Sequence, residues 1–348
     1  MASDAGEKGD MPDVKEIIFD HLGDRYGWEV PFNHHKTIPL PVIVWGSDGL
    51  HVFSSSRVEH NQVYVDGNAI FYIPTEGDFK GKVVEAVGAT VVDGKVVGGR
   101  TERPFDLSIT KNVLALFITI IVICALLFPL VKFYKKNGYK APRGFKGAIE
   151  ALVDFIYDGI VKATLKENAR RFAPFLLTVF FFIFIMNLMG LIVVFPGGAN
   201  LTGNIAITLV LAVLTFLVTN IFGTKHYWKE VFWPDVPLWL KFPIPIMPII
   251  EIFGVFTKPA ALTVRLFANM MGGHMIIIVL TMVIFIFGYL FGSIAAGGVS
   301  VVSVLFSVFM LLIDVLVSFI QAFVFTMLST IFISLAQEKP HHKEEAHA

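Results

Sequence analysis

The chain has few charged residues, a single cysteine and, after Pro259, no proline until Pro340. Charged residues make up 16% of its 348 residues, whereas hydrophobic residues make up 55%. This balance is too apolar for a soluble enzyme of this size and favours an all-α membrane protein with several spans. The formal net charge is zero and no long basic run is present, so we expect no nucleic acid partner.

Sequence motifs of soluble enzymes are also missing. The chain has no phosphate loop, dinucleotide fingerprint, nucleophile elbow or paired-cysteine metal site. Cys124 has no partner for an internal disulfide, and the neighbouring histidines His34 and His35 have no second ligand pair at a useful spacing. We therefore expect no metal and no cofactor. The first 30 residues lack the apolar core of a signal peptide, so either a presequence is absent from this chain or the first span directs insertion.

Residues 1–110 differ from the rest of the chain. They contain 17 Asp and Glu but 10 Lys and Arg, and they hold short runs typical of strands at 41–46, 69–74 and 83–97. The dipeptide Asp93-Gly94 lies between two valine pairs and tolerates the positive φ of a type I′ hairpin turn. We expect a small extramembrane region with β-hairpin content on the outer side of the membrane.

Five apolar runs follow. Those at 112–131, 175–195 and 205–223 each have about 20 residues, the length that crosses a bilayer core of roughly 30 Å. Those at 244–291 and 299–336 are much longer, and straight helices of that length would extend roughly 72 and 57 Å. We expect these two to form long, tilted antiparallel helices joined by a turn at 292–298.

The loop charges predict an orientation. Residues 132–172 hold ten Lys and Arg against four Asp and Glu, whereas the turns at 196–203 and 292–298 carry no charge. Because positive loops stay inside, we expect five crossings in a transmembrane domain at 111–336, with the N-terminus outside and the tail 337–348 inside. Apolar residues at helical spacing in 145–163 indicate either an interfacial amphipathic helix or a helix packed on a partner.

Both long runs contain polar stripes at helical spacing. The first stripe consists of Glu251, Lys258, Leu262, Arg265, Asn269 and Gly272. The second consists of Ser303, Ser307, Asp314, Ser318 and Gln321. A charged side chain near the bilayer centre costs about 2.5–3.5 kcal/mol on insertion scales, so Arg265 and Asp314 are candidates for function.

Antiparallel packing predicts two pairs across these helices. His274 would approach Asp314, and Arg265, which lies deeper, would approach Gln321. The offsets agree, because His274 and Arg265 are nine residues apart and Asp314 and Gln321 are seven residues apart. A histidine and a carboxylate are suited to proton relay near neutral pH. The alternatives are structural: a lone membrane histidine commonly binds a backbone carbonyl, and a serine-rich face is commonly a packing seam.

One motif carries a family resemblance. A set of residues in the two long runs closely resembles subunit a of F-type ATP synthases. It consists of Glu251, Lys258-Pro259, Leu262-x-x-Arg265-Leu266-Phe267-Ala268-Asn269-Met270 and Gly273-His274, with Gln321-Ala322-Phe323 downstream. Asn187-Leu188-Met189 also fits the family. The resemblance covers about residues 111–336 and leaves the acidic N-terminal region unexplained.

The resemblance implies a role for each site residue. Arg265 matches the essential arginine that faces the rotor ring of c subunits, and Asn269 and Glu251 match polar positions on the same helix. His274 stands where many members have Glu and Asp314 where those often have His, so the two halves of an acid–imidazole pair are exchanged. Gly190 departs from members that have Asp there.

The implied mechanism uses two offset proton half-channels. Protons would enter from the outer side past His274, Asp314, Asn269 and Gln321. They would be carried by the rotating c-ring and leave near Glu251. The chain would be the proton-translocating component of a two-sector ATPase without itself performing ATP chemistry. Its partners would be the c-ring, the b subunit of the peripheral stalk and the rest of the synthase, in a bacterial inner membrane or, alternatively, a mitochondrial one.

A second hypothesis is an independent secondary transporter with a midplane Arg, Asp and His site. Such transporters usually contain internal repeats with interrupted spans in both halves, and this chain has no evident repeat. Copurification with a ring of small hairpin subunits distinguishes the two hypotheses.

Overall fold

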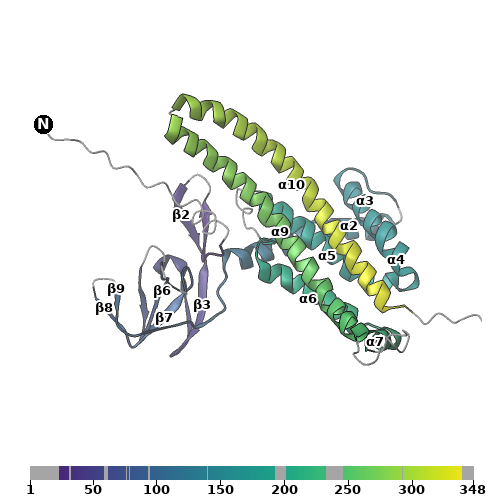
Figure 1. Cartoon of the computed structure of the whole chain (residues 1–348), viewed down its shortest axis with the longest axis horizontal. Coiled ribbons are helices and arrows are strands. Elements are labelled where there is room, and N and C mark those ends of the chain that lie inside the picture. The colour runs from purple at the N-terminus through teal and green to yellow at the C-terminus, as the bar shows by residue number, and fades with distance from the viewer. Residues whose placement is uncertain are drawn as a thin grey trace, which may run out of the picture. The chain divides into compact units, whose positions relative to one another are not determined.

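The structure is a computed structural model that describes residues 23–30, 33–58, 62–75, 77, 79–92, 95–138, 140–192, 201–232, 246–291 and 293–338. It divides into two compact units. One contains Met1–Leu114 and His274–Phe309, and the other contains Ala115–Gly273 and Met310–Ala348. Figure 1 shows strands at the N-terminal end of the chain and helices in the remainder. The division into domains at residues 110 and 336 stays a prediction.

Eleven strands lie in the described part of the N-terminal region. They are β1 Gly27–Val30, β2 Asn33–Pro39, β3 Pro41–Gly46, β4 Gly49–Ser54, β5 Tyr64–Asp66, β6 Ala69–Tyr72, β7 Val84–Val87, β8 Thr90–Val92, β9 Lys95–Val97, β10 Arg100–Glu102 and β11 Phe105–Asp106. All pairings are antiparallel. They form a three-stranded sheet in the order β11-β3-β4, a four-stranded sheet in the order β10-β7-β6-β5, and the hairpins β1-β2 and β8-β9.

The three runs that the sequence indicated contain five of these eleven strands. The run at 41–46 is β3, and the run at 69–74 is β6, which ends two residues early at Tyr72. The run at 83–97 is not one strand but three, β7, β8 and β9. Val92 pairs with Lys95, so a two-residue connection joins β8 to β9 as the Asp-Gly signal predicts, although residues 93 and 94 themselves lie outside the described residues.

Alternating side chains of β3 and β4 build the core of this region. Val42, Val44 and Phe53 are buried and pack with Phe71 of β6, as alternation along a strand predicts for one covered face. Glu85 of β7 is buried as well, and its carboxylate accepts hydrogen bonds from the backbone N–H and the hydroxyl of Ser47. These bonds compensate for the cost of burying a charge.

Seven helices make up most of the remaining described chain. They are α2 Lys111–Asn137, α3 Phe145–Ile156, α5 Ala169–Leu191, α6 Ile205–Ile221, α7 Lys225–Phe232, α9 Ile246–Phe291 and α10 Ser293–Ala336. A π-helical turn at Tyr157–Lys162, the single turn α4 Ala163–Leu165 and a 3₁₀ turn at Lys166–Asn168 connect α3 to α5.

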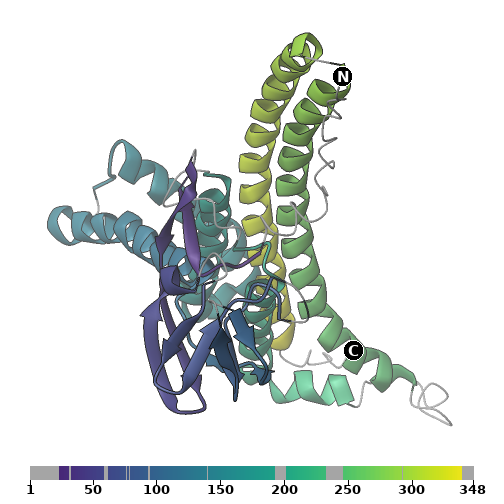
Figure 2. The same cartoon turned by 90° about the vertical axis from the view of Figure 1, so that its left-hand side faces the viewer.

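The two long apolar runs form continuous helices of 46 and 44 residues, α9 and α10. The predicted turn at 292–298 was wrong, because residues 293–298 belong to the first turns of α10. Residue 292 lies outside the described residues. A glycine in a helix costs only about 1 kcal/mol relative to alanine, so glycines alone did not justify a loop there. Figure 2 shows the two helices side by side.

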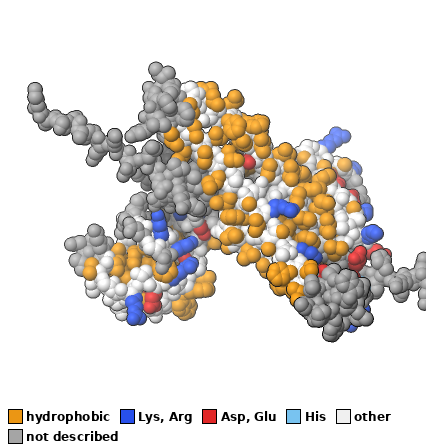
Figure 3. Space-filling view, viewed as in Figure 1, with side chains coloured by type: hydrophobic (Ala, Val, Ile, Leu, Met, Phe, Trp, Pro, Cys, Tyr) orange, Lys and Arg blue, Asp and Glu red, His pale blue; other side chains and the backbone are white. Residues whose placement is uncertain are grey.

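The described part of the chain contains three helices long and apolar enough to cross a membrane, or four if the bent pair α6 and α7 is one span. These two helices meet at an angle of 106°. The chain is therefore a helical membrane-type protein with a strand-rich N-terminal region. Five crossings, and the tilt of the long helices, stay predictions. Hydrophobic side chains cover most of the face of α9 and α10 seen in Figure 3, with few charged side chains among them.

The amphipathic segment at 145–163 packs within the protein at its C-terminal end. The ring of Phe155 stacks on Phe323 of α10 at a centroid distance of 5.8 Å and lies 6.4 Å from Phe319. Ile156 and Ile160 are buried. Of the two alternatives left open by the sequence, these contacts favour the packed helix for this end of the segment.

Candidate functional site

Two contacts show how α9 and α10 are aligned in the helical unit, which contains Ala115–Gly273 and Met310–Ala348. The Lys258 ammonium of α9 lies over the Phe332 ring of α10, 5.6 Å from its centroid. Fifteen residues farther along α9, a Cβ atom placed on Gly273 would lie 3.0 Å from Oδ1 of Asp314. The partner residue number falls as the α9 number rises, so the helices are antiparallel, as predicted, over this stretch.

The same two contacts give the level of Arg265. It lies seven residues after Lys258 and eight before Gly273, which corresponds to the middle of the 314–332 segment of α10, near Phe323. Gln321 is two residues from that point, within one helical turn. The two side chains make no hydrogen bond to each other in the structure, so their direct pairing stays a prediction.

Arg265 points away from the packed side of α9. Its side chain is exposed, and three small residues share this exposed stripe at steps of four, three and four: Ala261, Ala268 and Gly272. The buried side of the helix consists instead of larger residues such as Leu262, Leu266 and Met270. Small residues allow another helix to approach closely, so the guanidinium lies on a surface shaped for helix contact.

The polar stripe predicted for α9 is not a single exposed face. Leu262 is buried, Glu251, Lys258 and Asn269 are half-buried, and Arg265 is exposed. The stripe follows the border between the packed and the exposed sides of α9. Regular spacing defines an angular sector but not its position relative to the rest of the protein, which is why the sequence could not locate this border.

The polar stripe predicted for α10 does lie on its covered side. Ser303, Ser318 and Gln321 are buried, and Ser307 and Asp314 are half-buried, whereas most residues between 301 and 316 are exposed. The Ser318 hydroxyl donates a 2.7 Å hydrogen bond to the backbone carbonyl of Asp314. Two other polar atoms in this stripe, Oδ2 of Asp314 and Nε2 of Gln321, are buried without a hydrogen-bond partner among the described residues.

Unpaired buried polar atoms are rare in proteins and call for an explanation such as water, an ion or a catalytic role. Asp314 and Gln321 lie seven residues, or about 10 Å, apart along α10. Thr326 and Ser329, farther along the same helix, also have buried oxygens without a partner. The sequence stripe did not include these two positions, because they fall outside its angular sector.

The structure tests only part of the proposed His274 pair. Residue 274 belongs to the continuous helix α9, but its side chain lies outside the described side chains. Asp314 is placed by its contact with Gly273, the neighbour of His274 in the chain. The pairing of His274 with Asp314 stays a prediction.

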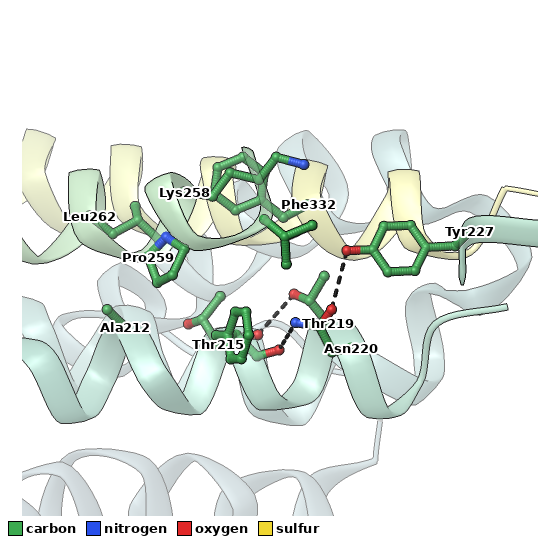
Figure 4. A pocket seen from close by; sticks show the side chains of 11 residues that line it. Ala212, Thr215, Thr219, Asn220, Tyr227, Lys258, Pro259, Leu262 and Phe332 are labelled. Carbon is green, nitrogen blue, oxygen red and sulfur yellow. Dashed lines mark hydrogen bonds between the residues drawn. The ribbon is translucent and has the colours of Figure 1, made fainter. Parts of the chain in front are cut away.

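A small cavity that the sequence did not indicate lies among α6, α7, α9 and α10. Its volume is about 20 Å³, room for a single water molecule. Four uncharged polar residues and one lysine line it, namely Thr215, Thr219, Asn220, Tyr227 and Lys258. Figure 4 shows the Tyr227 hydroxyl directed at Asn220, to whose Oδ1 it donates a 3.2 Å hydrogen bond, while the opposite wall comes from α9 with Pro259 and Leu262.

This cavity lies between α6 and the part of α9 that carries Glu251 and Lys258. Lys258 lines the cavity, and Glu251, two turns earlier on α9, lies within electrostatic range of Tyr227. The threonines of α6 bond within their own helix, with the Thr219 hydroxyl donating to the carbonyl of Thr215 at 2.8 Å. Threonines in an apolar helix carry no motif, so nothing in the sequence signalled this group.

Asn187 on α5 has a structural partner. Its Oδ1 accepts a 2.8 Å hydrogen bond from the Thr202 hydroxyl, and both side chains are fully buried. This bond ties α5 to the segment that enters α6. Within the described residues no group of three or more His, Cys, Asp and Glu is placed to hold a metal ion.

Two families match separate parts of the chain. Residues 113–334 match the family described as ATP synthase A chain, and residues 17–107 match a family described as a domain of unknown function. The ATP synthase subunit a of Chlorobium phaeobacteroides is 40% identical over 267 residues, covering 75% of this chain and 72% of the relative. That of Myxococcus xanthus is 38% identical over 259 residues, covering 72% and 80%.

The contact between Gly273 and Asp314 generates the first testable prediction. In Gly273→Ala the new methyl group would meet the carboxylate at 3.0 and 3.2 Å, so Asp314 must shift, and overpacking of this kind costs about 1–3 kcal/mol. We expect proton transport by the assembled complex to fall several-fold at unchanged protein level. The matched control is Gly254→Ala on the same helix, where the added atom meets nothing within 4 Å. Equal transport by both variants would show that the position of Asp314 is unimportant.

Proposed function

Because this chain belongs to the ATP synthase A chain family, we propose that it forms two offset proton half-channels against a rotor ring of c subunits. Its homologues support the general role, that of the proton-translocating membrane stator of an F-type ATP synthase. The exposed guanidinium of Arg265 on a surface of small residues is the observation that carries the proposal.

Arg265 acts on a carboxylate that belongs to the rotor. A positive charge within about 4–6 Å stabilises the ionised form of a carboxylic acid and lowers its pKa. A rotor carboxyl that arrives at Arg265 therefore releases its proton, and it must take up another before it returns to the lipid. The fixed charge also repels protons that would pass directly between the half-channels.

Arg265 is suited to this role by its exposure. A guanidinium that served only to stabilise the fold would be paired inside the helical unit, because an unpaired charge in an apolar environment is costly. Instead it projects from the side of α9 lined by Ala261, Ala268 and Gly272. A helix of the ring packed on these small residues would bring its carboxylate within reach of Arg265.

The outer half-channel in this proposal runs along the interface of α9 and α10. Asp314 and Gln321 contribute the unpaired buried atoms of α10. From α9, we assign Asn269 and His274 to the same path. Polar atoms without protein partners at intervals of about 10 Å are suited to bind water molecules that conduct protons.

The inner half-channel in this proposal begins near Glu251. The carboxylate lies within electrostatic range of Tyr227, which also lines the small cavity with Lys258 and Asn220 between α6 and α9. With the positive loops on the same side, Glu251 would face the cytoplasm and the N-terminal region would face the outside. The remaining proposed partner is the b subunit of the peripheral stalk, and the proposed location is a bacterial inner membrane.

Replacement of the arginine tests the proposal directly. In Arg265→Ala the rotor carboxylate loses the charge that ionises it, so we expect ATP-driven proton pumping to fall to background while passive proton leak rises. Arg265→Lys keeps a charge but loses the planar fork of donors, and we expect partial loss. Pumping is measured by acidification of membrane vesicles and leak by the decay of an imposed gradient.

The control for this experiment is Arg170→Ala. Arg170 is an exposed arginine at the start of α5 in the same unit, outside the proposed path, and its loss should leave coupled pumping intact. Normal coupled pumping by Arg265→Ala would refute the assigned role.

Exchange of the two halves of the predicted pair tests the outer half-channel. We expect the double variant His274→Asp with Asp314→His to retain more pumping than either single variant, because the pair keeps one carboxylate and one imidazole. The measurement is ATP-driven acidification at matched levels of assembled complex. A double variant no better than the worse single variant would mean that the residues do not act together.

A further inference from the structure

The three-stranded sheet β11-β3-β4 has an outward face that is almost entirely apolar. Five exposed side chains form it: Trp45, Leu50, Val52, Phe105 and Leu107. Trp45 is 59% exposed, Val52 60% and Phe105 69%. The inward face of the same strands carries Val42, Val44 and Phe53, which are buried in the core of the strand-rich region. We call the five exposed residues the apolar sheet face.

Strand register makes this face continuous. Trp45 of β3 lies opposite Leu50 of β4 on one side and opposite Phe105 of β11 on the other. The next row toward Pro41 has Ile43 opposite Val52, and the N–H of Leu107 donates a 2.9 Å hydrogen bond to the carbonyl of Ile43. Directly opposed side chains on one face are in contact distance, so two rows across three strands make one patch.

This pattern is unlike that of a sheet with one face in water. Such a sheet alternates apolar residues inside with polar residues outside. The exposed residues of strand β10 in the other sheet, Arg100, Thr101 and Glu102, are by contrast all polar. The apolar sheet face breaks the rule at Trp45, Leu50 and Val52. Exposed apolar patches of this kind mark interaction sites.

The chain fixes this face next to the first membrane span. After β11 the backbone keeps pairing with β3, and the N–H of Ile109 donates a 3.1 Å hydrogen bond to the carbonyl of Pro41. The helix α2 begins two residues later at Lys111. Leu107 is four residues before Lys111, so it lies no farther than about 13 Å from the start of the span.

Further hydrogen bonds hold the first turn of α2 against the strand-rich region. The N–H of Lys111 donates to the carbonyl of Arg25 at 2.9 Å, and the N–H of Asn112 donates to Oδ1 of Asp24 at 3.2 Å. The carboxylate of Asp24 thus satisfies one of the free N–H groups at the helix start, where negative charge is favourable. These bonds tie the first residues of α2, up to Leu114, to the compact unit that contains the sheet.

From this geometry we infer that the apolar sheet face docks on the lipid surface of the membrane that α2 enters. The interfacial layer of a bilayer favours Trp and other aromatic side chains at its polar boundary, and apolar residues enter it readily. Trp45 and Phe105 are adjacent aromatic residues in one row of the face, and the other row, with Val52 and Leu107 nearer to α2, is aliphatic. The contact anchors the strand-rich region and holds α2 at a defined depth.

The experiment uses the full chain reconstituted in phosphatidylethanolamine and phosphatidylglycerol vesicles. Cys124, the single cysteine, is replaced in Cys124→Ser, and one cysteine is then introduced by Leu50→Cys or Val52→Cys. The matched controls are Val65→Cys on β5 and Val97→Cys on β9, which are 51% and 54% exposed outside this face. Each cysteine receives a nitroxide, and collisions with oxygen, which concentrates in lipid, are compared with collisions with a water-soluble nickel chelate.

We expect oxygen to dominate at positions 50 and 52 and the nickel chelate to dominate at 65 and 97. Dominance of the nickel chelate at all four positions would overturn the inference, because the face would then lie in water. Protection of positions 50 and 52 from both reagents would overturn it too, because a protein partner would then cover the face.

A second measurement avoids the labels. Brominated lipids quench tryptophan fluorescence at short range, and the unlabelled chain is compared with Trp45→Phe. We expect the quenched part of the signal to shrink in Trp45→Phe, because Trp45 contributes to it. An unchanged quenched part would place Trp45 away from lipid and contradict the inference.

Discussion

The packing of α9 is explained by the free-energy cost of one positive charge, that of Arg265, in an apolar helix. Placing Arg265 in such a helix costs about 2.5–3.5 kcal/mol on insertion scales, and no acidic residue of the described chain bonds to it. The residues around Arg265 leave its side chain exposed. Leu262, Leu266 and Met270 take the buried side of α9, so the guanidinium is left on the side with the small residues. We propose that its partner lies on another subunit.

The second requirement is the register between α9 and α10. Lys258 over Phe332 and Gly273 against Asp314 fix two levels, and every polar residue of the proposed outer half-channel lies between or next to them. A glycine at position 273 lets the carboxylate approach the backbone of α9. Packing thus places the unpaired atoms of Asp314 and Gln321 inside the helix interface, where bound water would supply their missing hydrogen bonds.

Much of this arrangement was predictable from the sequence, for physical reasons that can be named. Runs of apolar residues predicted α2, α5, α6, α9 and α10, because hydrophobic length is a strong signal, and Asp93-Gly94 predicted the β8-β9 hairpin. The spacing of Ser318 and Gln321 predicted their shared face. The position of Arg265 at the level of Gln321 agrees with the antiparallel expectation, although the two side chains make no hydrogen bond to each other in the structure.

Other features depend on tertiary contacts that no local pattern encodes. The turn expected at 292–298 is helical, because weak helix formers in an apolar helix are tolerated when the helix is otherwise uninterrupted. The sector of α9 that holds Leu262 is buried because of the helices packed against it. The cavity with Tyr227 and Asn220 combines residues from four helices, and the apolar sheet face becomes visible only when strand register brings Trp45 next to Phe105.

The central claim is that the Arg265 side of α9 faces the rotor. The most direct measurement introduces a diazirine-bearing side chain at Ala268, in the assembled complex, and identifies the photo-crosslinked product by mass spectrometry. The same side chain at the exposed Val210 of α6 serves as the reference position. The account predicts a product between position 268 and the small ring subunit, close to its carboxyl-bearing residue, and none of that kind from position 210. A product at position 268 with lipid alone, or with any other subunit, would contradict it.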